Sequence, residues 1–470
     1  MRHFILLTLL LLQPLISFAQ ALDYDHLALL FSNEKFQGTA RFNAMGGAFG
    51  ALGGDISASY SNPASGAVFN HNEFSGSLQS STRKTNANYY GTTTYNEFTK
   101  LNAQQWGAVF VFDNFNQQSP WRKFALGVNY SIQQNFNNNY SVNGNNTANF
   151  AIFTTHPEDT NSPQTNYSTS EYQSFTNDTR GLNEVYTFSF SAAYENTLYI
   201  GASLNTHSID FTQDAFLYED NTDGEGNTLL SDFIQYQSQI GSGVSVGLGI
   251  IAKPNRNIRL GLSYQSPVWY YDVQEETNIS DADGYNGEIY INADNISPLY
   301  QNTPFYNNYN YTLKTPSKVT LSSAFLFNKS GLISMDYSLQ NFKNTHLDDN
   351  DNSFTNSNKA ITSIANDQAS TLRIGSEWRA KQWRFRGGYV QQKNILTHQP
   401  SSFDTKKYSF GLGFQFKNAK VDLSYEKSDN SELYNFYDAS YDFYEKTTKI
   451  DAAKLNFKNS QIGLTLTFLL

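Results

Sequence analysis

One short motif in the sequence could place a serine for nucleophilic chemistry. The run Gly243-Val244-Ser245-Val246-Gly247 fits the pattern Gly-x-Ser-x-Gly, which in hydrolases puts the serine on a sharp turn between a strand and a helix. Here large apolar residues alternate with small ones straight through the motif, a period typical of a continuous strand. We therefore interpret the match as accidental, predict no catalytic residue, and expect the chain not to be an enzyme.

Residues that could bind a metal or a cofactor are few and badly spaced. The chain has no cysteine, which excludes disulfides, thiolate zinc sites and iron–sulfur clusters. Its histidines show no i, i+4 pair or other ligand spacing. Two acidic stretches, Asp220–Gly224 and Asp281–Gly284, lack the full ligand spacing of a calcium loop, and we interpret them as solvated loops. The sequence thus predicts no metal and no cofactor.

The composition combines a polar average with many aromatic residues. The 470 residues carry a formal net charge of −10, and aromatics make up 15% of the chain at a mean hydropathy of −0.51. The acidic balance argues against nucleic acid as a partner, because phosphate binding needs a basic face. Aromatic girdles around a wet interior are typical of an outer-membrane barrel.

The N-terminus predicts export. A short positive start, Met1–His3, precedes the apolar block Phe4–Ile16 and the small-x-small triplet Ser17–Ala19. These are the three parts of a secretory signal peptide, so we expect residues 1–19 to be removed. No later run of eighteen apolar residues could form a transmembrane helix, which leaves a soluble protein or a barrel.

Alternation of side chains favours the barrel. Val244, Val246, Leu248 and Ile250 share one face of a predicted strand, whose other face is glycine and serine. The pattern recurs in 258–265, 372–379, 383–389, 408–416, 421–426 and 462–468. Short turns alternate with long polar connections, for example 254–257 with 211–235. We predict an all-β fold: a 14-stranded antiparallel transmembrane β-barrel over residues 72–470, with long extracellular loops.

Charged residues occur on the small-residue faces of these strands. We expect this set to face the lumen: Arg259, Arg373, Glu377, Arg384, Arg386, Asp422 and Glu426. One interpretation is a ladder of ion pairs that braces neighbouring strands, which we favour because charges in barrel interiors commonly pair. The other is a set of cations that steers a carboxylate headgroup.

Residues 20–71 do not read as strands. The segment is rich in glycine and small residues, and it is too apolar for a solvated tail. We predict a hatch that plugs the lumen of the barrel. Its candidate gating residues are Met45, Gly46, Gly47, Phe49, Gly53, Gly54, Asp55, Asn62, Pro63 and Ala64.

Four stretches, 38–69, 241–267, 370–390 and 408–426, together resemble the FadL/TodX family of outer-membrane transporters in its Bacteroidetes-type form. The resemblance implies a 14-stranded barrel with an internal N-terminal hatch, and passive uptake of hydrophobic molecules such as long-chain fatty acids or aromatic hydrocarbons. The chain departs from the family pattern where Ser65 precedes Gly66 and where Phe468, not the last residue, is the terminal aromatic.

The expected location is the bacterial outer membrane, and the expected partners are outer-membrane lipid and a fatty acid-like molecule. We predict ligand capture by outer-loop aromatics (Phe305, Tyr306, Tyr309 and Tyr311), and a shift of the hatch between Gly46 and Asn62. By resemblance the exit is lateral, through the wall into the bilayer. The alternative is a FadL-like barrel that serves a secretion system or a scaffold and binds protein partners. The hatch disfavours a plain porin.

Overall fold

The computed structural model describes residues 22–116, 118–145, 151, 154–156, 162–279, 288–289, 300–301, 305–397, 399–434 and 452–470. Its helices are α1 (Tyr24–Ser32), α2 (Ala40–Ala44), α3 (Ala58–Ser61), η1 (Pro63–Val68), η2 (Phe342–Asn344), α4 (Thr355–Ile364) and η3 (Ser401–Phe403). Its strands are β1 (Glu73–Tyr89), β2 (Thr92–Asp113), β3 (Trp121–Asn135), β4 (Asn138–Gly144), β5 (Thr169–Tyr194), β6 (Leu198–Thr222), β7 (Thr228–Ala252), β8 (Ile258–Gln265), β9 (Trp269–Ile279), β10 (Glu288–Ile289), β11 (Tyr300–Gln301), β12 (Phe305–Lys314), β13 (Lys318–Phe327), β14 (Gly331–Gln340), β15 (His346–Asp348), β16 (Ala369–Ala380), β17 (Trp383–Gln392), β18 (Thr405–Gln415), β19 (Ala419–Tyr434) and β20 (Ala453–Leu469).

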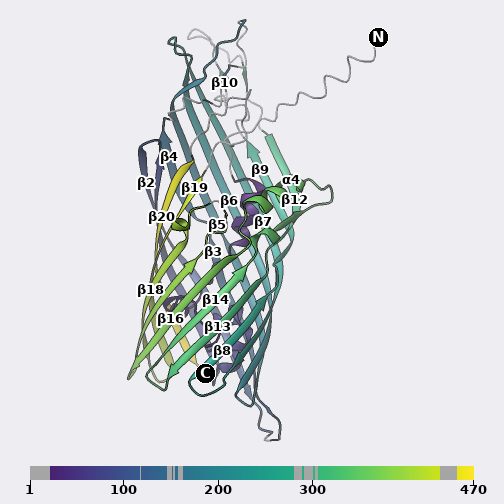
Figure 1. Ribbon diagram of the computed structural model, residues 1–470, viewed down its shortest axis with the longest axis vertical. Helices are drawn as coiled ribbons and strands as arrows, with labels where there is room; N and C mark the ends of the chain where they lie inside the picture. Colours follow the sequence, from purple (N-terminus) through teal and green to yellow (C-terminus); the bar gives the residue numbers. More distant parts are fainter. Residues whose placement is uncertain are drawn as a thin grey trace.

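The strands form a closed antiparallel barrel (Figure 1). The sheet closes because β1 pairs with β2 on one side and with β20 on the other. Four barrel strands are each built from two segments, β3 with β4, β8 with β9, β12 with β13, and β14 with β15. The predicted number of fourteen strands is confirmed.

Short turns at one end of the barrel lie where the sequence predicted them, for example between β5 and β6 and between β7 and β8. The predicted polar connection 211–235 is wrong. β6 and β7 pair without interruption as far as Thr222 and Thr228, so β5, β6 and β7 reach 26, 25 and 25 residues. A tilted strand needs only about 10 residues to cross the hydrocarbon core. These strands rise above their neighbours (Figure 1), where polar side chains on the outer face suit water and hide the strand pattern.

The outer face of the barrel carries an apolar band. Val246, Leu248 and Ile250 are 42%, 52% and 43% exposed, while the glycines between them face inward. Trp378, Trp383, Phe385 and Phe410 are exposed on the other side of the barrel. The predicted strand parity is therefore correct, and a lipid-facing surface is what such a band suits. Among the described residues, no helix has the length and apolarity to cross a bilayer.

The described residues before β1 lie inside the barrel (Figure 1), and the first strand begins at Glu73, close to the predicted boundary. Two apolar clusters hold this segment. Phe42, Met45 and Phe49 pack against wall residues of β13 and β14. Leu27, Leu29 and Phe31 from α1 form the second cluster with residues of β6, β9 and β12. The lumen is therefore filled by the chain's own N-terminal segment.

Candidate functional site: the hatch and the barrel wall

Glycines of the wall let the hatch segment 38–69 lie against the strands backbone to backbone. A Cβ atom at Gly249 would lie 1.9 Å from Asn62 Oδ1, and one at Gly375 would lie 2.5 Å from the Met45 carbonyl oxygen. Atoms cannot approach so closely, so these positions require glycine. The hatch therefore touches β7 and β16 with no space for a ligand between them.

The predicted gating residues make most of these contacts. Asn62 is fully buried; its Nδ2 donates to the Gly50 carbonyl at 2.7 Å and to the Ile250 carbonyl of β7 at 3.2 Å. Gly53 and Gly54 have φ angles of 59° and 65°, a left-handed conformation that favours glycine. Met45, Gly46, Gly47, Phe49, Pro63 and Ala64 are also buried. The segment predicted to shift is thus the part most tightly bound to the wall.

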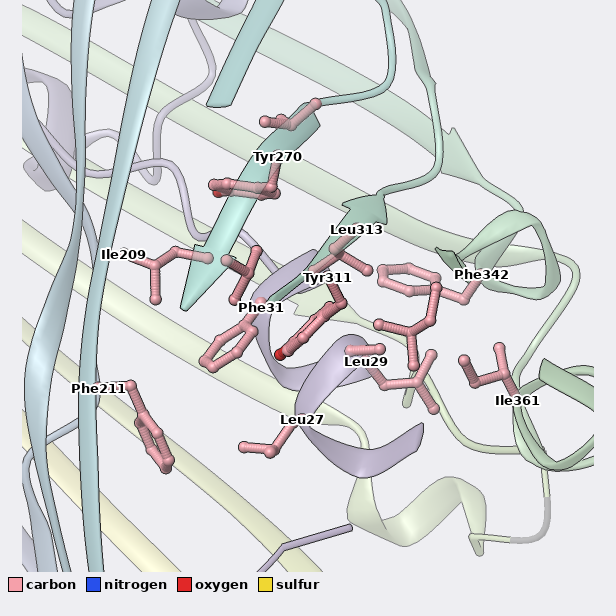
Figure 2. Packing of buried hydrophobic residues seen from close by; sticks show 14 of the residues in the cluster. Leu27, Leu29, Phe31, Ile209, Phe211, Tyr270, Tyr311, Leu313, Phe342 and Ile361 are labelled. Atoms are coloured by element: carbon pink, nitrogen blue, oxygen red, sulfur yellow. The ribbon is translucent and has the colours of Figure 1, made fainter. Parts of the chain in front are cut away.

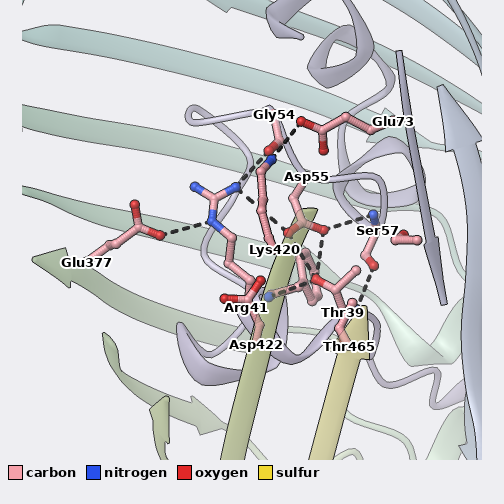
Figure 3. A network of polar contacts seen from close by, with 12 residues as sticks. Thr39, Arg41, Gly54, Asp55, Ser57, Glu73, Glu377, Lys420, Asp422 and Thr465 are labelled. Carbon is pink, nitrogen blue, oxygen red and sulfur yellow. Dashed lines mark hydrogen bonds and ion pairs between the residues drawn. The ribbon is translucent and has the colours of Figure 1, made fainter. Parts of the chain in front are cut away.

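A network of charges fastens the same segment (Figure 3). Arg41 Nε donates to Glu377 at 3.0 Å, and Arg41 NH1 donates to the Gly54 carbonyl at 2.7 Å. Glu377 also accepts from Arg386 Nε at 2.8 Å, and Arg386 NH1 donates to Asp422 at 2.6 Å. The hatch arginine therefore binds Glu377, which in turn links it to two more of the predicted lumen charges, Arg386 and Asp422.

Asp55 lies on the hatch side of this network. Its carboxylate accepts from Thr39 Oγ1 at 2.9 Å and from the Ser57 backbone N–H at 3.1 Å. Burial raises the pKa of Asp55 above its ordinary value, although Arg41 and Thr39 act in the opposite direction. Neither Arg41 nor Thr39 stood out in the sequence; an arginine within an otherwise apolar, glycine-rich segment was the available signal.

The other predicted lumen charges have separate partners. Arg259 donates to the Leu52 carbonyl of the hatch, and Arg373 donates to Ser338 Oγ at 3.0 Å with its guanidinium 4.6 Å from the Phe36 ring centre. Glu426 pairs with Lys407 at 2.7 Å. Arg384 lies apart from the network and donates to backbone carbonyls of its own turn. Ion pairs, which the ladder interpretation expects, thus include Glu377, Arg386, Asp422 and Glu426. Arg259, Arg373 and Arg384 donate to neutral oxygen atoms instead.

The upper half of the hatch, residues 22–37, is held mainly by apolar contacts (Figure 2). Phe31 is fully buried, with its ring centre 5.6 Å from that of Phe136 and 5.5 Å from that of Phe211. On the other side of α1, Ile361 of α4 belongs to the same cluster. The wall here presents large side chains instead of glycine, so a smaller or displaced α1 would leave an apolar space.

Two of the predicted capture aromatics belong to this region. The prediction that they lie in an outer loop is wrong, because β12 pairs with β9 from Phe305 to Lys314. Tyr311 is buried and donates its hydroxyl to Gln239 Oε1 at 3.0 Å, and Tyr309 contacts Asp349. Tyr306 faces outward and is 67% exposed, while the Phe305 side chain lies outside the described residues. A run rich in asparagine and tyrosine resembles a loop, yet alternation puts its odd-numbered residues inside the barrel.

Ser245 of the Gly-x-Ser-x-Gly run does meet a histidine and a carboxylate. Its Oγ lies 2.8 Å from His207 Nε2, and His207 Nδ1 lies 3.2 Å from Glu34 Oε1. The serine and histidine are buried, and the carboxylate belongs to the hatch. Moving the hatch to admit a substrate would remove Glu34 from His207.

Ser245 and His207 of the wall instead hold Glu34, which lies just after the end of α1. Tyr60 donates its hydroxyl to Glu34 Oε2 at 2.5 Å. Burial acts to raise the pKa of Glu34, but His207, Lys318 and Tyr60 outweigh it and bring the pKa to about 2. Glu34 is therefore an ionised anchor for the upper hatch over the physiological range.

Lys35 follows Glu34 in the upper hatch. Its side chain is exposed, and its neighbours include Arg83 of β1 and Lys407 of β18. The enclosing barrel and these two cations lower the pKa of Lys35 to about 8. Three cations thus lie beside α1, with the carboxylate of Glu432 nearby and Lys407 paired with Glu426 at 2.7 Å. The sequence pattern did not identify this place.

The wall ladder is interrupted near these cations. In the described part of the chain, β2 and β3 pair from Asp113 only as far as Gln105, opposite Ser131, and β2 has no ladder with β4. Above that point side chains bridge the two strands: Gln104 Nε2 donates to the Ile132 carbonyl at 2.7 Å, and Asn96 Oδ1 accepts from the Ser141 N–H at 3.2 Å. We refer to this interruption as the seam.

The seam connects the apolar cluster of α1 with the outer surface. Phe136, at the break between β3 and β4, packs on Phe31 from the inside. The Lys35 N–H donates to the Gln133 carbonyl at 3.3 Å, which ties the hatch to the same break. Outside, Leu101 of β2 is 65% exposed. Apolar residues therefore lie on both the inner and the outer side of a stretch of wall that has no backbone pairing.

One group among the described residues has the geometry to hold a cation. Ligand atoms of Asp23, Asp25 and His26, at the start of α1, lie within 4.8 Å of one another. His26 Nδ1 lies 3.5 Å from the Asp25 carboxylate. Two of the three side chains are exposed, and such acidic groups commonly need no metal, so we assign none.

Comparison with known proteins gives structural matches alone. No family model matches the sequence, and no curated relative matches it. A Pseudomonas aeruginosa FadL homologue has a TM-score of 0.57 at 12% identity, with 93% of this chain and 99% of that chain covered. The Pseudomonas putida toluene transporter TodX gives 0.53 at 14%, covering 93% and 99%. The Ralstonia pickettii toluene transporter TbuX gives 0.52 at 14%, covering 94% and 100%. The chain therefore has the fold of the FadL/TodX barrels, as the sequence resemblance predicted.

Proposed function

We propose that the chain is an outer-membrane channel for the passive uptake of hydrophobic small molecules. The exposed apolar band and the charged lumen suit a barrel in the outer membrane. Three barrels of the same fold are named as transporters or as a FadL homologue. No residue arrangement described above supplies an energy source, so we expect transport down a gradient.

One observation carries the proposal: the seam lies beside the apolar cluster of α1, whereas the lower hatch is fastened to the wall. A molecule that replaces the contacts of Phe31 gains burial of apolar surface, which contributes about 25 cal/mol per Å². From there the seam beside Phe136 leads toward the bilayer. We propose lateral release by this route, because the glycine contacts at Gly249 and Gly375 oppose an axial one.

We further propose long-chain fatty acids as ligands. Lys35 and Arg83 lie together near α1, and cations form stronger hydrogen bonds with a carboxylate than with a neutral group. The apolar cluster of α1 offers the neighbouring site for a hydrocarbon tail. A neutral aromatic hydrocarbon would use the second feature and not the first.

Uptake of labelled oleate tests the proposal in cells that lack the gene, carry it, or carry it without residues 22–64. We expect uptake to require the intact chain, and equal uptake in all three strains would refute the channel. A disulfide across the seam, between Asn96→Cys and Ser141→Cys, tests the lateral route, since the native chain has no cysteine to interfere. Oxidation should stop uptake, and reduction should restore it.

The scaffold alternative has one feature in its favour. β5, β6 and β7 project well beyond the length that a bilayer requires, and a projecting wall offers surface to a protein partner. Purification in mild detergent separates the two functions. A stoichiometric protein that stays bound supports the scaffold, whereas a lipid-like molecule identified by mass spectrometry supports the channel.

A further inference from the structure

Two cations cross the seam and hold the same residue. Arg83 NH1 of β1 donates to the Asn137 carbonyl at 3.1 Å, and Lys100 Nζ of β2 donates to Asn137 Oδ1 at 3.2 Å. Asn137 lies on the far side of the seam, between β3 and β4, and is buried. These two bonds therefore do the work that a backbone ladder does elsewhere in the wall.

The wall at Asn137 is held in a way that allows local displacement. The Asn137 N–H donates to Asn135 Oδ1 at 2.9 Å, and its Nδ2 lies 3.4 Å from the Gly181 carbonyl. Gly181 has a φ of 115°, and the pairing of β3 with β5 shifts register between Ile132 and Gln134. The wall at Asn137 is thus held by side chains next to an irregular ladder, which makes a local displacement cheap compared with breaking paired strands.

The charges of Arg83 and Lys100 are directed at neutral oxygen atoms. Among the described residues neither forms an ion pair: Arg83 Nε donates to Asn459 Oδ1 at 2.9 Å, and Glu432 attracts Arg83 without a direct contact. Glu426, the other lumen carboxylate nearby, already pairs with Lys407. A carboxylate adds the attraction between opposite charges to the hydrogen bond, which a neutral amide oxygen does not. An anionic ligand therefore competes well with Asn137 for both cations.

We propose that Arg83 and Lys100 form a lock on the seam, and that the carboxylate of an amphiphile opens it by taking the place of Asn137. The inference rests on the proposed lateral route and deepens it, because it names the residues that hold the route closed and the headgroup that releases them. The tail of the same molecule lies in the apolar cluster beside Phe136, on the inner side of the seam. The lock thus opens when a ligand with both parts is present.

The test measures access to the seam directly. Ile132→Cys places a single thiol at a position that is 3% exposed beside the seam, in a chain with no other cysteine. Maleimide labelling of this thiol is followed in detergent-solubilised full-length protein, with and without oleate. The neutral probe of the same chain length is oleyl alcohol. We expect oleate to accelerate labelling at least tenfold and oleyl alcohol to leave it unchanged.

Removal of the lock is the second arm. The double variant Arg83→Gln with Lys100→Gln should label at least tenfold faster without ligand, and oleate should add nothing. Lys84→Gln is the matched control, because Lys84 neighbours Arg83 in β1 but faces outward, where it pairs with the exposed Glu97 at 3.1 Å. If the double variant does not fold, Lys100→Met alone replaces it, with a smaller increase expected.

Two results overturn the lock: equal labelling of the wild-type and lock variants, or equal acceleration by oleate and oleyl alcohol. The uptake assay with the cross-linked seam tests the lateral route separately from the lock. If oxidation of Asn96→Cys with Ser141→Cys leaves uptake intact while the lock variant still labels faster, the lateral route is wrong and the lock on the wall stands.

Discussion

Loss of the Glu377 carboxylate should release the lower hatch. The side chain is 2% exposed and binds Arg41 at 3.0 Å, Arg386 at 2.8 Å and Arg379 at 2.9 Å. Glu377→Gln removes the charge and leaves the size. Breaking a buried pair while its partners stay charged costs about 3–5 kcal/mol. Arg386 keeps Asp422 at 2.6 Å, whereas Arg41 keeps only a longer contact to Asp55 at 3.9 Å, so the hatch arginine loses its shortest ion pair.

At about 1.4 kcal/mol per tenfold, this cost raises the population of displaced hatch by roughly a hundredfold to a few thousandfold. A cysteine at Met45, which is fully buried under β16, reports that population through its rate of maleimide labelling. Native barrel migration on a gel shows that the strands still close.

The control and the refutation come from the same chain. Lys84 and Glu97 form an ion pair on the outer face with both side chains 55% exposed, and such a pair is worth about 0–1 kcal/mol. Glu97→Gln should therefore leave Met45→Cys labelling unchanged. If Glu377→Gln labels no faster than this control, the network does not hold the hatch. The coupling between Arg41→Gln and Glu377→Gln should exceed about 1 kcal/mol in a double-mutant cycle.

Three further predictions concern other contacts of the hatch. Gly249→Val should displace the hatch, because its Cβ would overlap Asn62 Oδ1. Gly76→Val should leave the hatch in place, because a Cβ at Gly76 meets nothing within 4 Å. Equal labelling of the hatch in both variants would contradict the packing argument. Phe31→Ala should destabilise the docking of α1 by about 3–5 kcal/mol, seen as faster hydrogen exchange in residues 24–32 with residues 38–69 unchanged. Oleate affinity should fall as the pH rises through about 8, since Lys35 loses its charge there while the carboxylate stays ionised; the fall is at most about tenfold per pH unit. Lys35→Arg should keep its affinity to pH 10, and a wild-type affinity that is flat from pH 7 to 10 would remove Lys35 from the ligand site.

The strands could be predicted because parity is a local property. The large apolar Val246 faces outward and the small Gly247 faces inward, so each residue type indicates its own side of the strand. Repetition of this pattern along the chain predicts the barrel. The same locality explains the error at 211–235 and at Phe305–Lys314. Outside the bilayer the outer face of a strand is polar, so alternation weakens while the inward residues Phe211 and Tyr311 stay apolar and buried.

The site was harder to predict, because its contacts join residues that are far apart in sequence. Arg41 and Glu377 are 336 positions apart, and nothing in either segment names the other. Glycine at Gly249 reads as a small inward residue, and only the fold shows that Asn62 lies against it. The seam left no trace in the sequence, since Lys100 and Asn137 look like ordinary polar residues of an outer loop or strand end.

The two halves of the hatch are held by different forces, and this difference favours one kind of gating. The lower half depends on geometry and charge: glycines at van der Waals contact and an arginine bound to a buried carboxylate. A hydrophobic ligand offers nothing that replaces either contact. The upper half depends largely on apolar packing around Phe31, which a hydrocarbon tail can replace at little net cost. Glu34 is the exception, since its bond to His207 keeps the end of α1 in place. A ligand should therefore displace α1 toward the seam at Phe136. Glu34 at the end of α1 and the lower half of the hatch, residues 38–69, should stay in place.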